Sequence, residues 1–494
     1  MNQRVSSRHE NDLGGQFLPF GNTEKVGVTV EIPSAVAGIP SVQHTAWMLI
    51  NLLARFEGVV HRVGVRCPPG VKLNGRVIPL AARELDLATA LITGGNAIGV
   101  VPVEENLTLE RTIVIGPGQG YAGRPDLFAI GSGWSGGVSV NPPGFDGHLH
   151  DSTLPFGPYI AACIAAGEVF KAARMRPASY SAPQAAFYSC WNHRANDRLN
   201  AEGPQDVDIA LDASLVGVGA VGSAVMHSLW ACSALRGSMA IIDNDPKGLD
   251  VSNLNRYSIF GQDAVGRQKA TCAADILSDA SIRWLADDVA VESFTLTTPR
   301  VLSAVDRNTA RAAIQNQYPA RIFSGSTLDL RAEVLRCGPP GVGACLRCFN
   351  EPEKLPPDDE LRSKLKAADE TELAALAESV GLTVAEANEW VATGRCGVAG
   401  ERLLPLLRRN DGEPAFAVGF VSVMSGVMLA AELLKDHLVH AAPLTEGQQR
   451  AAFQLFSPLA RSNRAVAFLR DPRCPMCVPK SIACDIWAQR YSGL

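Results

Sequence analysis

The chain has 494 residues, of which 47% are hydrophobic and 19% are charged. These proportions fit a globular protein of about two to four domains and exclude a largely disordered one. The 45 basic and 50 acidic side chains give a net charge of −5, which disfavours a protein that coats nucleic-acid phosphates. The polar N-terminus lacks the apolar core of a secretory signal, so we expect a cytoplasmic protein whose twelve cysteines serve as thiols or metal ligands.

The first half of the chain, up to about residue 195, carries a faint α/β pattern. Strands are predicted at 26–32 and 59–65, with a helix at 41–56 between them. The connection PSAVAGIPS has prolines where a phosphate-binding loop needs free N–H groups. A GxGxxG match at 131–136 is followed by two prolines, which favours a simple turn, and a small-residue helix is expected at 155–173. We therefore expect a degenerate α/β domain without catalysis of its own.

The second half opens with a nucleotide-binding pattern. A strand at 209–216 precedes Gly217, Gly219 and Gly222, then a helix at 223–235 and a strand at 239–242 that ends at Asp243. The glycines allow a tight turn, close approach of N–H groups to a phosphate, and close helix packing, while the acid can bind ribose hydroxyls. The pattern favours a nucleotide site, and the alternative is a tight turn without a ligand.

An apolar segment at 416–434 approaches the length of a membrane-spanning helix. It contains Glu432 and is followed directly by Lys435, and Gly, Ser and Ala interrupt it. These features favour a helix buried between two layers of an α/β protein over a membrane span.

A set of charged and polar residues follows the nucleotide-binding pattern. They form an Asp-Asn-Asp run at 243–245, a Ser-Asn-Leu-Asn-Arg run at 252–256, a lysine thirteen residues later, and an aspartate after a predicted strand at 300–305. With this set, residues 209 to 477 resemble the ubiquitin-activating superfamily, which includes the bacterial activators of thiamin and molybdopterin sulfur carriers. The resemblance implies adenylation with ATP and Mg²⁺. The site residues that it implies are Gly217, Gly219, Gly222, Asp243, Asp245, Asn253, Arg256, Lys269 and Asp306.

The chemistry of adenylation explains why these residue types suit the task. A carboxylate attacks the α-phosphate and pyrophosphate leaves, so Arg256 and Lys269 can stabilise the charge that gathers on the phosphates. Asp306 can bind Mg²⁺, which prefers oxygen ligands. Asp243 can bind the ribose, and Asn253 can donate a hydrogen bond to a phosphate. Each residue alone could be an ordinary solvated side chain, and only their joint spacing indicates a site.

Two Cys-x-x-Cys pairs, Cys345 with Cys348 and Cys474 with Cys477, can each supply half of a tetrahedral zinc site. The gap of 125 residues between them is far longer than in a zinc ribbon, so the spacing alone leaves open a redox-active or simply buried pair. The resemblance implies a structural zinc ion at this place.

An insertion is expected between the two pairs, from 351 to about 412. A segment rich in charge and proline precedes a predicted helix that ends at 392, and Cys396 then follows Arg395. The adjacent cation favours the thiolate of Cys396, which can accept the acyl group as a thioester. The alternative is an ordinary loop thiol, and Cys337 is the next candidate acceptor.

These observations predict two Rossmann-like adenylation domains in one pseudo-dimer, a degenerate one at 1–195 and an active one at 196–494. The layout resembles the activators of bacterial ubiquitin-like conjugation operons linked to antiviral defence. The expected reaction is adenylation of the C-terminal glycine of a ubiquitin-like protein, thioester formation on Cys396, and transfer to a conjugating enzyme. The pattern is compatible with a homodimer. We expect neither nucleic acid nor a membrane as a partner.

Three alternatives share parts of this pattern. A sulfur-carrier adenylyltransferase would use the same site, but the insertion and the pseudo-dimer layout favour conjugation. A dinucleotide-dependent oxidoreductase would use the glycine turn, yet it gives no reason for Lys269 or the cysteine pairs. A scaffold with an inactive nucleotide fold would have lost the charged set, which is present here.

Overall fold

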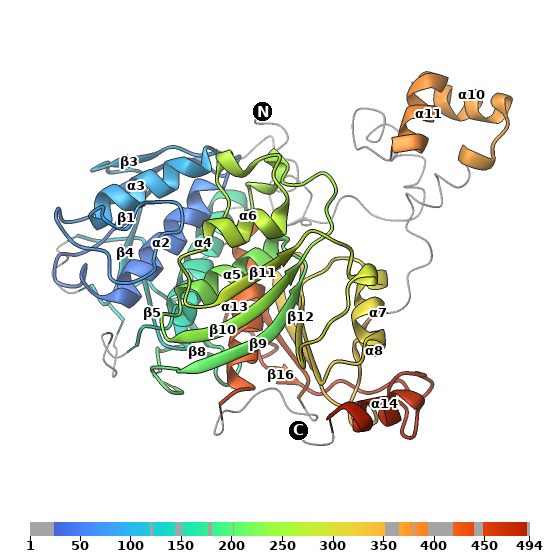
Figure 1. The fold of residues 1–494 in the computed structure, drawn as a ribbon. Coiled ribbons are helices and arrows are strands. Elements are labelled where there is room, and N and C mark those ends of the chain that lie inside the picture. Colours follow the sequence, from blue (N-terminus) through green and yellow to red (C-terminus); the bar gives the residue numbers. More distant parts are fainter. Residues whose placement is uncertain are drawn as a thin grey trace. The chain divides into compact units, whose positions relative to one another are not determined.

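The computed structural model describes residues 24–118, 121, 123–143, 149, 152–175, 180–200, 202–350, 365–379, 382–393, 418–438 and 448–491. The chain divides into two compact units. The larger unit comprises Met1–Asn350 and Phe416–Leu494, and it contains both sheets of the fold (Figure 1). The smaller unit comprises Glu351–Ala415.

The first sheet has eight strands in the order β3-β2-β1-β4-β5-β6-β7-β8. The first five strands in this order are parallel, and the remaining pairs are antiparallel. The strands are β1 (Val26–Glu31), β2 (Val60–Arg66), β3 (Val103–Glu105), β4 (Arg111–Ile115), β5 (Leu127–Ser132), β6 (Ser135–Ser139), β7 (Ala185–Ser189) and β8 (Arg194–Asn196).

The second sheet repeats this topology strand by strand, in the order β11-β10-β9-β12-β13-β14-β15-β16. It too is parallel up to its fifth strand and antiparallel beyond it. The strands are β9 (Ile209–Val216), β10 (Leu235–Ile242), β11 (Arg283–Asp287), β12 (Arg300–Ser303), β13 (Arg321–Leu328), β14 (Arg331–Cys337), β15 (Arg450–Gln454) and β16 (Ala465–Val466). The prediction of two Rossmann-like domains is confirmed, because each half has its own mixed α/β sheet.

Helices from the two halves meet in one continuous core. Helix α4 packs on β5 and β6 of the first sheet, α13 packs on β13 and β14 of the second, and α4 and α13 pack on each other. The helices of the larger unit are α2 (Pro40–Ala54), α3 (Leu87–Ile98), α4 (Phe156–Arg174), α5 (Ala220–Ala231), α6 (Lys269–Ile276), α7 (Asn308–Asn316), α8 (Leu346–Phe349), α13 (Gly419–Lys435) and α14 (Ile482–Tyr491).

The GxGxxG match in the first half is a turn, as expected. It forms the hairpin between β5 and β6, and Gly133 in the turn has a φ of +56°. A side chain at Gly131 or Gly136 would overlap the backbone of Gly157 at the start of α4. These glycines therefore let a helix approach the sheet closely rather than bind a phosphate.

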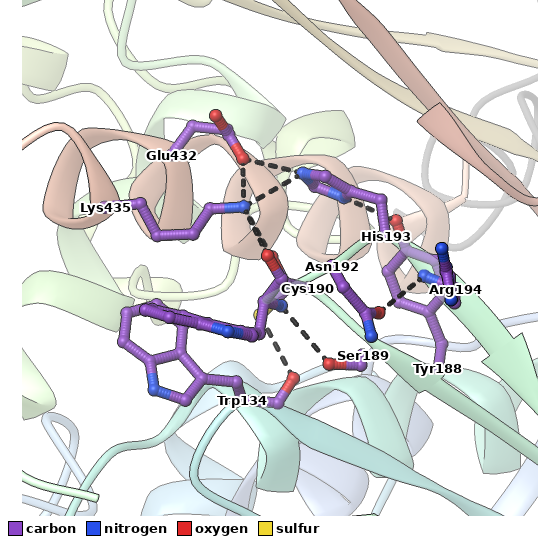
Figure 2. A network of polar contacts seen from close by, with 10 residues as sticks. Trp134, Tyr188, Ser189, Cys190, Asn192, His193, Arg194, Glu432 and Lys435 are labelled. Atoms are coloured by element: carbon purple, nitrogen blue, oxygen red, sulfur yellow. Dashed lines mark hydrogen bonds and ion pairs between the residues drawn. The ribbon is translucent and has the colours of Figure 1, made fainter. Parts of the chain in front are cut away.

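Helix α13 is buried over its whole length, which confirms the expectation for the apolar segment. Within the described part of the chain, no helix is long and apolar enough to cross a membrane. The two charged residues of α13, Glu432 and Lys435, form an ion pair with each other (Figure 2). Lys435 Nζ also donates to the carbonyl oxygens of Cys190 (2.8 Å) and Trp191 (3.0 Å) in the first half.

His193 completes this buried network. Its Nε2 lies 2.6 Å from Glu432 Oε1, and its Nδ1 lies 2.8 Å from the Tyr188 hydroxyl (Figure 2). Burial and the nearby Lys435 lower the pKa of His193 to about 4, so the ring is neutral at neutral pH. A neutral ring with its proton on Nε2 donates to Glu432 and accepts from Tyr188, which satisfies both nitrogens.

The smaller unit contains two helices, α10 (Glu370–Ser379) and α11 (Val384–Thr393). They share a small core of their own that includes Leu373, Ala377 and Trp390. The single helix predicted up to 392 was wrong because a second helix begins after Thr383. The Glu386 carboxylate accepts from the Thr383 backbone N–H (2.8 Å), and Thr383 Oγ1 accepts from the Glu386 N–H (3.3 Å), a reciprocal cap that starts a new helix.

Candidate functional site

The glycine turn lies at the carboxyl end of β9, as predicted. Gly217 has a φ of +95°, and a Cβ there would lie 2.7 Å from the Ala304 carbonyl oxygen. A side chain at Gly222 would overlap the Gly217 carbonyl. Gly219 is the N-cap of α5, and the nearest atom that a Cβ there would meet is the Tyr257 hydroxyl, at 3.7 Å. Two glycines therefore allow the tight turn, and the third leaves room beside the first amide groups of α5.

Helix α5 begins and ends earlier than predicted, and β10 begins earlier. Gly222 lies inside the first helical turn because Gly219 already serves as the cap. The helix ends at Ala231, and Leu235 at the start of β10 is fully buried. The predicted order of strand, turn, helix, strand and acid is otherwise confirmed.

Asp243, at the end of β10, is hydrogen-bonded to the glycine turn. Its Oδ2 accepts from the Val218 N–H at 2.6 Å, and its Oδ1 accepts from the Asp245 N–H at 3.0 Å. Burial raises the pKa of Asp243, an effect that Lys269 and the two amide donors partly offset. The carboxylate thus lies beside the backbone groups that a nucleotide would contact.

Lys269 begins α6 and forms an ion pair with Asp245, with Nζ 2.5 Å from Oδ2. Burial would lower the pKa of Lys269, but Tyr257, Asp243 and Asp245 outweigh burial and raise it, so the lysine is a cation at neutral pH. The structure therefore places Asp243, Asp245 and Lys269 in one cluster at the carboxyl edge of the sheet.

Arg256 lies in the segment between β10 and α6, and it is buried. Its Nη1 donates to the Ser252 carbonyl (2.9 Å) and to Asn255 Oδ1 (2.8 Å). Asn253, also buried, accepts from the Asp250 N–H through Oδ1 at 3.0 Å, which leaves the amide nitrogen as the donor of that side chain. Both predicted residues are thus held by hydrogen bonds within their own loop.

Tyr257 is a site residue that the sequence reasoning missed. Both cations lie over its ring, the Arg256 guanidinium carbon 5.2 Å and Lys269 Nζ 5.5 Å from the ring centroid. An aromatic face attracts cations at these distances, so the Tyr257 ring helps to hold both Arg256 and Lys269 in place. Its position directly after the Ser-Asn-Leu-Asn-Arg run was the available signal.

Asp306 lies in an exposed turn between β12 and α7. The turn is fixed by Arg311, which donates to the Val305 carbonyl (2.7 Å) and to Asn308 Oδ1 (2.6 Å). Because β12 is the parallel neighbour of β9, Asp306 is at the same edge of the sheet as the glycine turn. An exposed carboxylate at that edge fits a Mg²⁺ ion, which keeps several waters and few protein ligands.

The four predicted zinc ligands come together in one cluster. The Sγ atoms of Cys345, Cys348, Cys474 and Cys477 all lie within 4.8 Å of one another. Neighbouring Sγ distances are 3.9, 3.6 and 3.3 Å. Four sulfurs at about 2.3 Å from a tetrahedral zinc ion would lie about 3.8 Å apart, so the cluster fits that ion. A hydrogen bond from the Cys477 thiol lowers the pKa of Cys345 to about 6, which favours the thiolate that a metal needs.

The candidate acceptor Cys396 lies outside the described residues. Cys337, the second candidate, is buried at the end of β14, and burial raises the pKa of its thiol well above the usual range. A buried neutral thiol is a poor nucleophile, so the structure does not favour Cys337 as an acceptor.

The sequence profile of the ThiF family matches residues 210–476, which is more than half of the chain and includes every described site residue except Cys477. The chain belongs to the ThiF family. A curated relative, the uncharacterized protein y4jF of Sinorhizobium fredii, is 28% identical over 355 residues, which cover 64% of this chain and 66% of the relative.

Solved structures of E. coli MccB are also similar to the chain. MccB with ATP is 15% identical and covers 54% of this chain and 65% of that chain, with a TM-score of 0.36. MccB with AMPCPP and MccA is 16% identical and covers 54% and 66%, with a TM-score of 0.36. The chain therefore spans a little under two thirds of the length of these relatives.

The ThiF-family site has the parts that nucleotide chemistry requires. An open helix N-terminus can bind a phosphate, Lys269 and Arg256 can stabilise negative charge on the phosphates, and Asp306 can hold a metal ion. The four-cysteine cluster offers four protein ligands, which would suit a structural ion rather than a catalytic one.

Proposed function

We propose that this ThiF-family protein uses ATP and Mg²⁺ to adenylate the C-terminal glycine of a ubiquitin-like protein. The substrate carboxylate would attack the α-phosphate, form the acyl–AMP anhydride, and expel pyrophosphate. The Cys396 thiolate would then attack the anhydride carbonyl and expel AMP to form a thioester, and the acyl group would pass to a conjugating enzyme, which frees the Cys396 thiol.

One observation carries the adenylation step. Lys269, a buried cation, lies between Asp245 and the Tyr257 ring, and the Tyr257 hydroxyl lies close to the glycine turn. Preplaced cations beside a phosphate-binding helix N-terminus stabilise the charge that develops on the α-phosphate and on the departing pyrophosphate. Dinucleotide-dependent hydride transfer would not need a second cation in this place.

The conjugation steps rest on the layout of the chain. Both halves lie on one chain and share a core, so the degenerate half takes the place of a partner subunit. A separate small unit at Glu351–Ala415 carries the residue Cys396. Sulfur transfer to a carrier protein would require neither feature.

The test is pyrophosphate exchange into ATP by the full chain. We expect exchange to depend on an added ubiquitin-like protein that ends in glycine and to vanish when that glycine is deleted from the protein. Pyrophosphate exchange that is equally fast without any carrier would contradict the proposal. So would the absence of exchange with every member of a panel of carriers that end in glycine.

A second measurement separates conjugation from sulfur transfer. With ATP and carrier present, we expect a covalent adduct on non-reducing gels that a thiol reagent releases. Cys396→Ala should remove the adduct and retain exchange. Exchange without any thiol-sensitive adduct in the parent would instead favour a sulfur-carrier adenylyltransferase.

A further inference from the structure

A cation from the degenerate half is built into the segment that carries Arg256. Arg55 directly follows α2, and its side chain is buried, with 1% of the residue exposed. Its Nη1 donates to the Leu254 carbonyl and its Nη2 to the Phe260 carbonyl, both at 2.8 Å. One guanidinium from the first half thus binds the backbone on both sides of Arg256.

Asn51, one helical turn before Arg55, adds a third bond to the same segment. Its Nδ2 donates to the Ser258 carbonyl at 2.7 Å, and its Oδ1 accepts from Arg55 Nε at 2.7 Å. The two side chains therefore orient each other and together bind three carbonyl oxygens between 254 and 260. We call Asn51 and Arg55 the α2 clamp.

The clamped segment has little regular structure to hold it in shape. It lies between two short 3₁₀ turns, Val251–Asn253 and Gln262–Ala264, and contains no helix or strand of its own. Backbone carbonyls buried in such a loop need partners from elsewhere, and here the α2 clamp supplies three. The position of Arg256 and Tyr257 thus depends on a helix from the other half.

Protonated Arg55 suits this task better than a neutral side chain would. Burial lowers the pKa of Arg55 to about 9, so it remains a cation at neutral pH. Hydrogen bonds from an ionised donor are stronger than neutral ones, and the planar fork fixes their directions. Loss of Arg55 would leave two buried carbonyls without their donors, and the segment would have to move to find water.

We propose that Asn51 and Arg55 are positioning residues for adenylation. They hold segment 254–260 so that Arg256 and Tyr257 meet the phosphates of bound ATP, which gives the degenerate half a defined part in the reaction. This inference rests on the proposed adenylation, and it goes beyond it by assigning residues outside the ThiF-matching region to the site.

The chain offers a matched control in Arg76. This arginine also belongs to the first half and also binds the second half through its guanidinium. It donates to the carbonyls of Trp230 (2.5 Å) and Cys232 (2.7 Å) at the end of α5. Because α5 has twelve residues, those carbonyls lie about 18 Å from the glycine turn at its start. Arg76 thus contributes the same kind of contact between the halves, away from the phosphates.

The experiment compares Arg55→Met with Arg76→Met in the full chain. We measure the Kd for Mg·ATP by calorimetry, pyrophosphate exchange per folded molecule, the melting temperature, and amide hydrogen exchange over 254–260. For Arg55→Met we expect affinity or exchange kcat/KM to fall by about ten- to a hundredfold, with faster amide exchange in that segment. For Arg76→Met we expect a lower melting temperature but a change in ATP affinity of less than about twofold.

Two milder variants keep the test decisive if Arg55→Met does not fold. Arg55→Lys retains the charge but loses the planar fork and the Nε–H bond to Asn51, and Asn51→Ala removes the Ser258 bond together with the acceptor of Arg55 Nε. Both should show intermediate losses in ATP affinity and exchange. Equal effects of the Arg55 and Arg76 variants on ATP affinity, at equal loss of stability, would overturn the positioning role.

The outcome is distinguishable from a failure of the proposed function. ATP affinity and amide exchange need no carrier protein, so they test the α2 clamp even if no carrier supports pyrophosphate exchange. A parent chain that binds ATP, with a clamp variant that does not, supports the clamp whatever the substrate is. A parent that shows exchange, with an Arg55→Met variant of unchanged ATP affinity and exchange, refutes the clamp alone.

Discussion

The two halves of the molecule share a strand order but differ at the edge where a nucleotide would bind. In the second half, the strand β9 is followed by Gly217 and β10 by Asp243. In the first half, the corresponding strands β1 and β2 are followed by Ile32 and Cys67, and the last residues of these strands, Glu31 and Arg66, form an ion pair at 2.9 Å. The same sheet topology therefore presents a glycine turn and an acid at one edge and a partly exposed salt bridge at the other.

The helices that follow show the same difference. Helix α6 begins with Lys269, whereas its counterpart α3 begins with Leu87. Helix α5 begins after Gly219, whereas α2 begins with a proline, which lacks an N–H group. The first half thus keeps the sheet topology and its packing against the second half, whereas its described residues at this edge differ from the glycine turn, the acid and the lysine of the second half.

The sharpest test of this difference removes one cation at each of the two edges. Lys269→Met should lower pyrophosphate exchange by about a hundred- to a thousandfold, because a preplaced charge beside the phosphates is lost. Arg66→Met, at the equivalent edge of the first sheet, should leave exchange unchanged. Equal losses in both variants would mean that the first half also takes part in phosphate binding.

Zinc binding provides a second contrast. Among the described residues, the only cluster with metal-ligand geometry is the four-cysteine group of the second half. We expect about one zinc ion per chain by elemental analysis, and Cys474→Ser should lower both zinc content and stability, the latter by about 3 kcal/mol or roughly 3 °C in Tm. Cys163→Ser, at a buried cysteine in the first half, should leave the zinc content unchanged. The site would be refuted if the parent chain contained no zinc even when it was purified with added zinc.

A further contrast concerns pH and the buried histidines. The pKa of His193 is about 4 in the folded chain, against an ordinary value of 6.5. In the unfolded chain His193 therefore binds a proton below about pH 6.5, whereas in the folded chain it binds one only below about pH 4. Stability from this group is complete above pH 6.5 and is lost as the pH falls to 4.

Denaturant unfolding between pH 4 and 7.5 measures this loss. His193→Gln should flatten the dependence by up to about 1.4 kcal/mol per pH unit, which corresponds to one proton. His61→Gln, at an exposed position, serves as the control. An unchanged slope in His193→Gln would assign the acid sensitivity to other groups. Two further buried histidines, His44 and His227, also have lowered pKa values, of about 4 and about 3.

Local sequence patterns were sufficient to predict the elements that carry the site. The apolar run at 209–216, the three glycines and Asp243 fix a strand, a turn and a second strand through short-range sterics, and the structure has them in that order. The two Cys-x-x-Cys pairs were likewise recognisable, because each pair is a local motif. The ending of α10 and the start of α11 were also local, and the Thr383-x-x-Glu386 capping pattern could have revealed them.

The remaining features depend on contacts between distant parts of the chain. Arg55 reads as an ordinary residue near the end of an apolar helix, and only the fold brings it to Leu254 and Phe260. The pairing of His193 with Glu432 spans 239 residues. No periodicity or motif spacing encodes such contacts, because they arise from how α2 and α13 pack against the other half.

The packing of α4 against α13 has a kinetic consequence. Enzymes assembled from separate subunits dissociate on dilution, and their activity then falls with concentration. Here a covalent link and a common apolar interior join the halves, so no dissociation constant governs their association. The turnover number per molecule should accordingly stay constant down to the lowest enzyme concentration that an assay can detect.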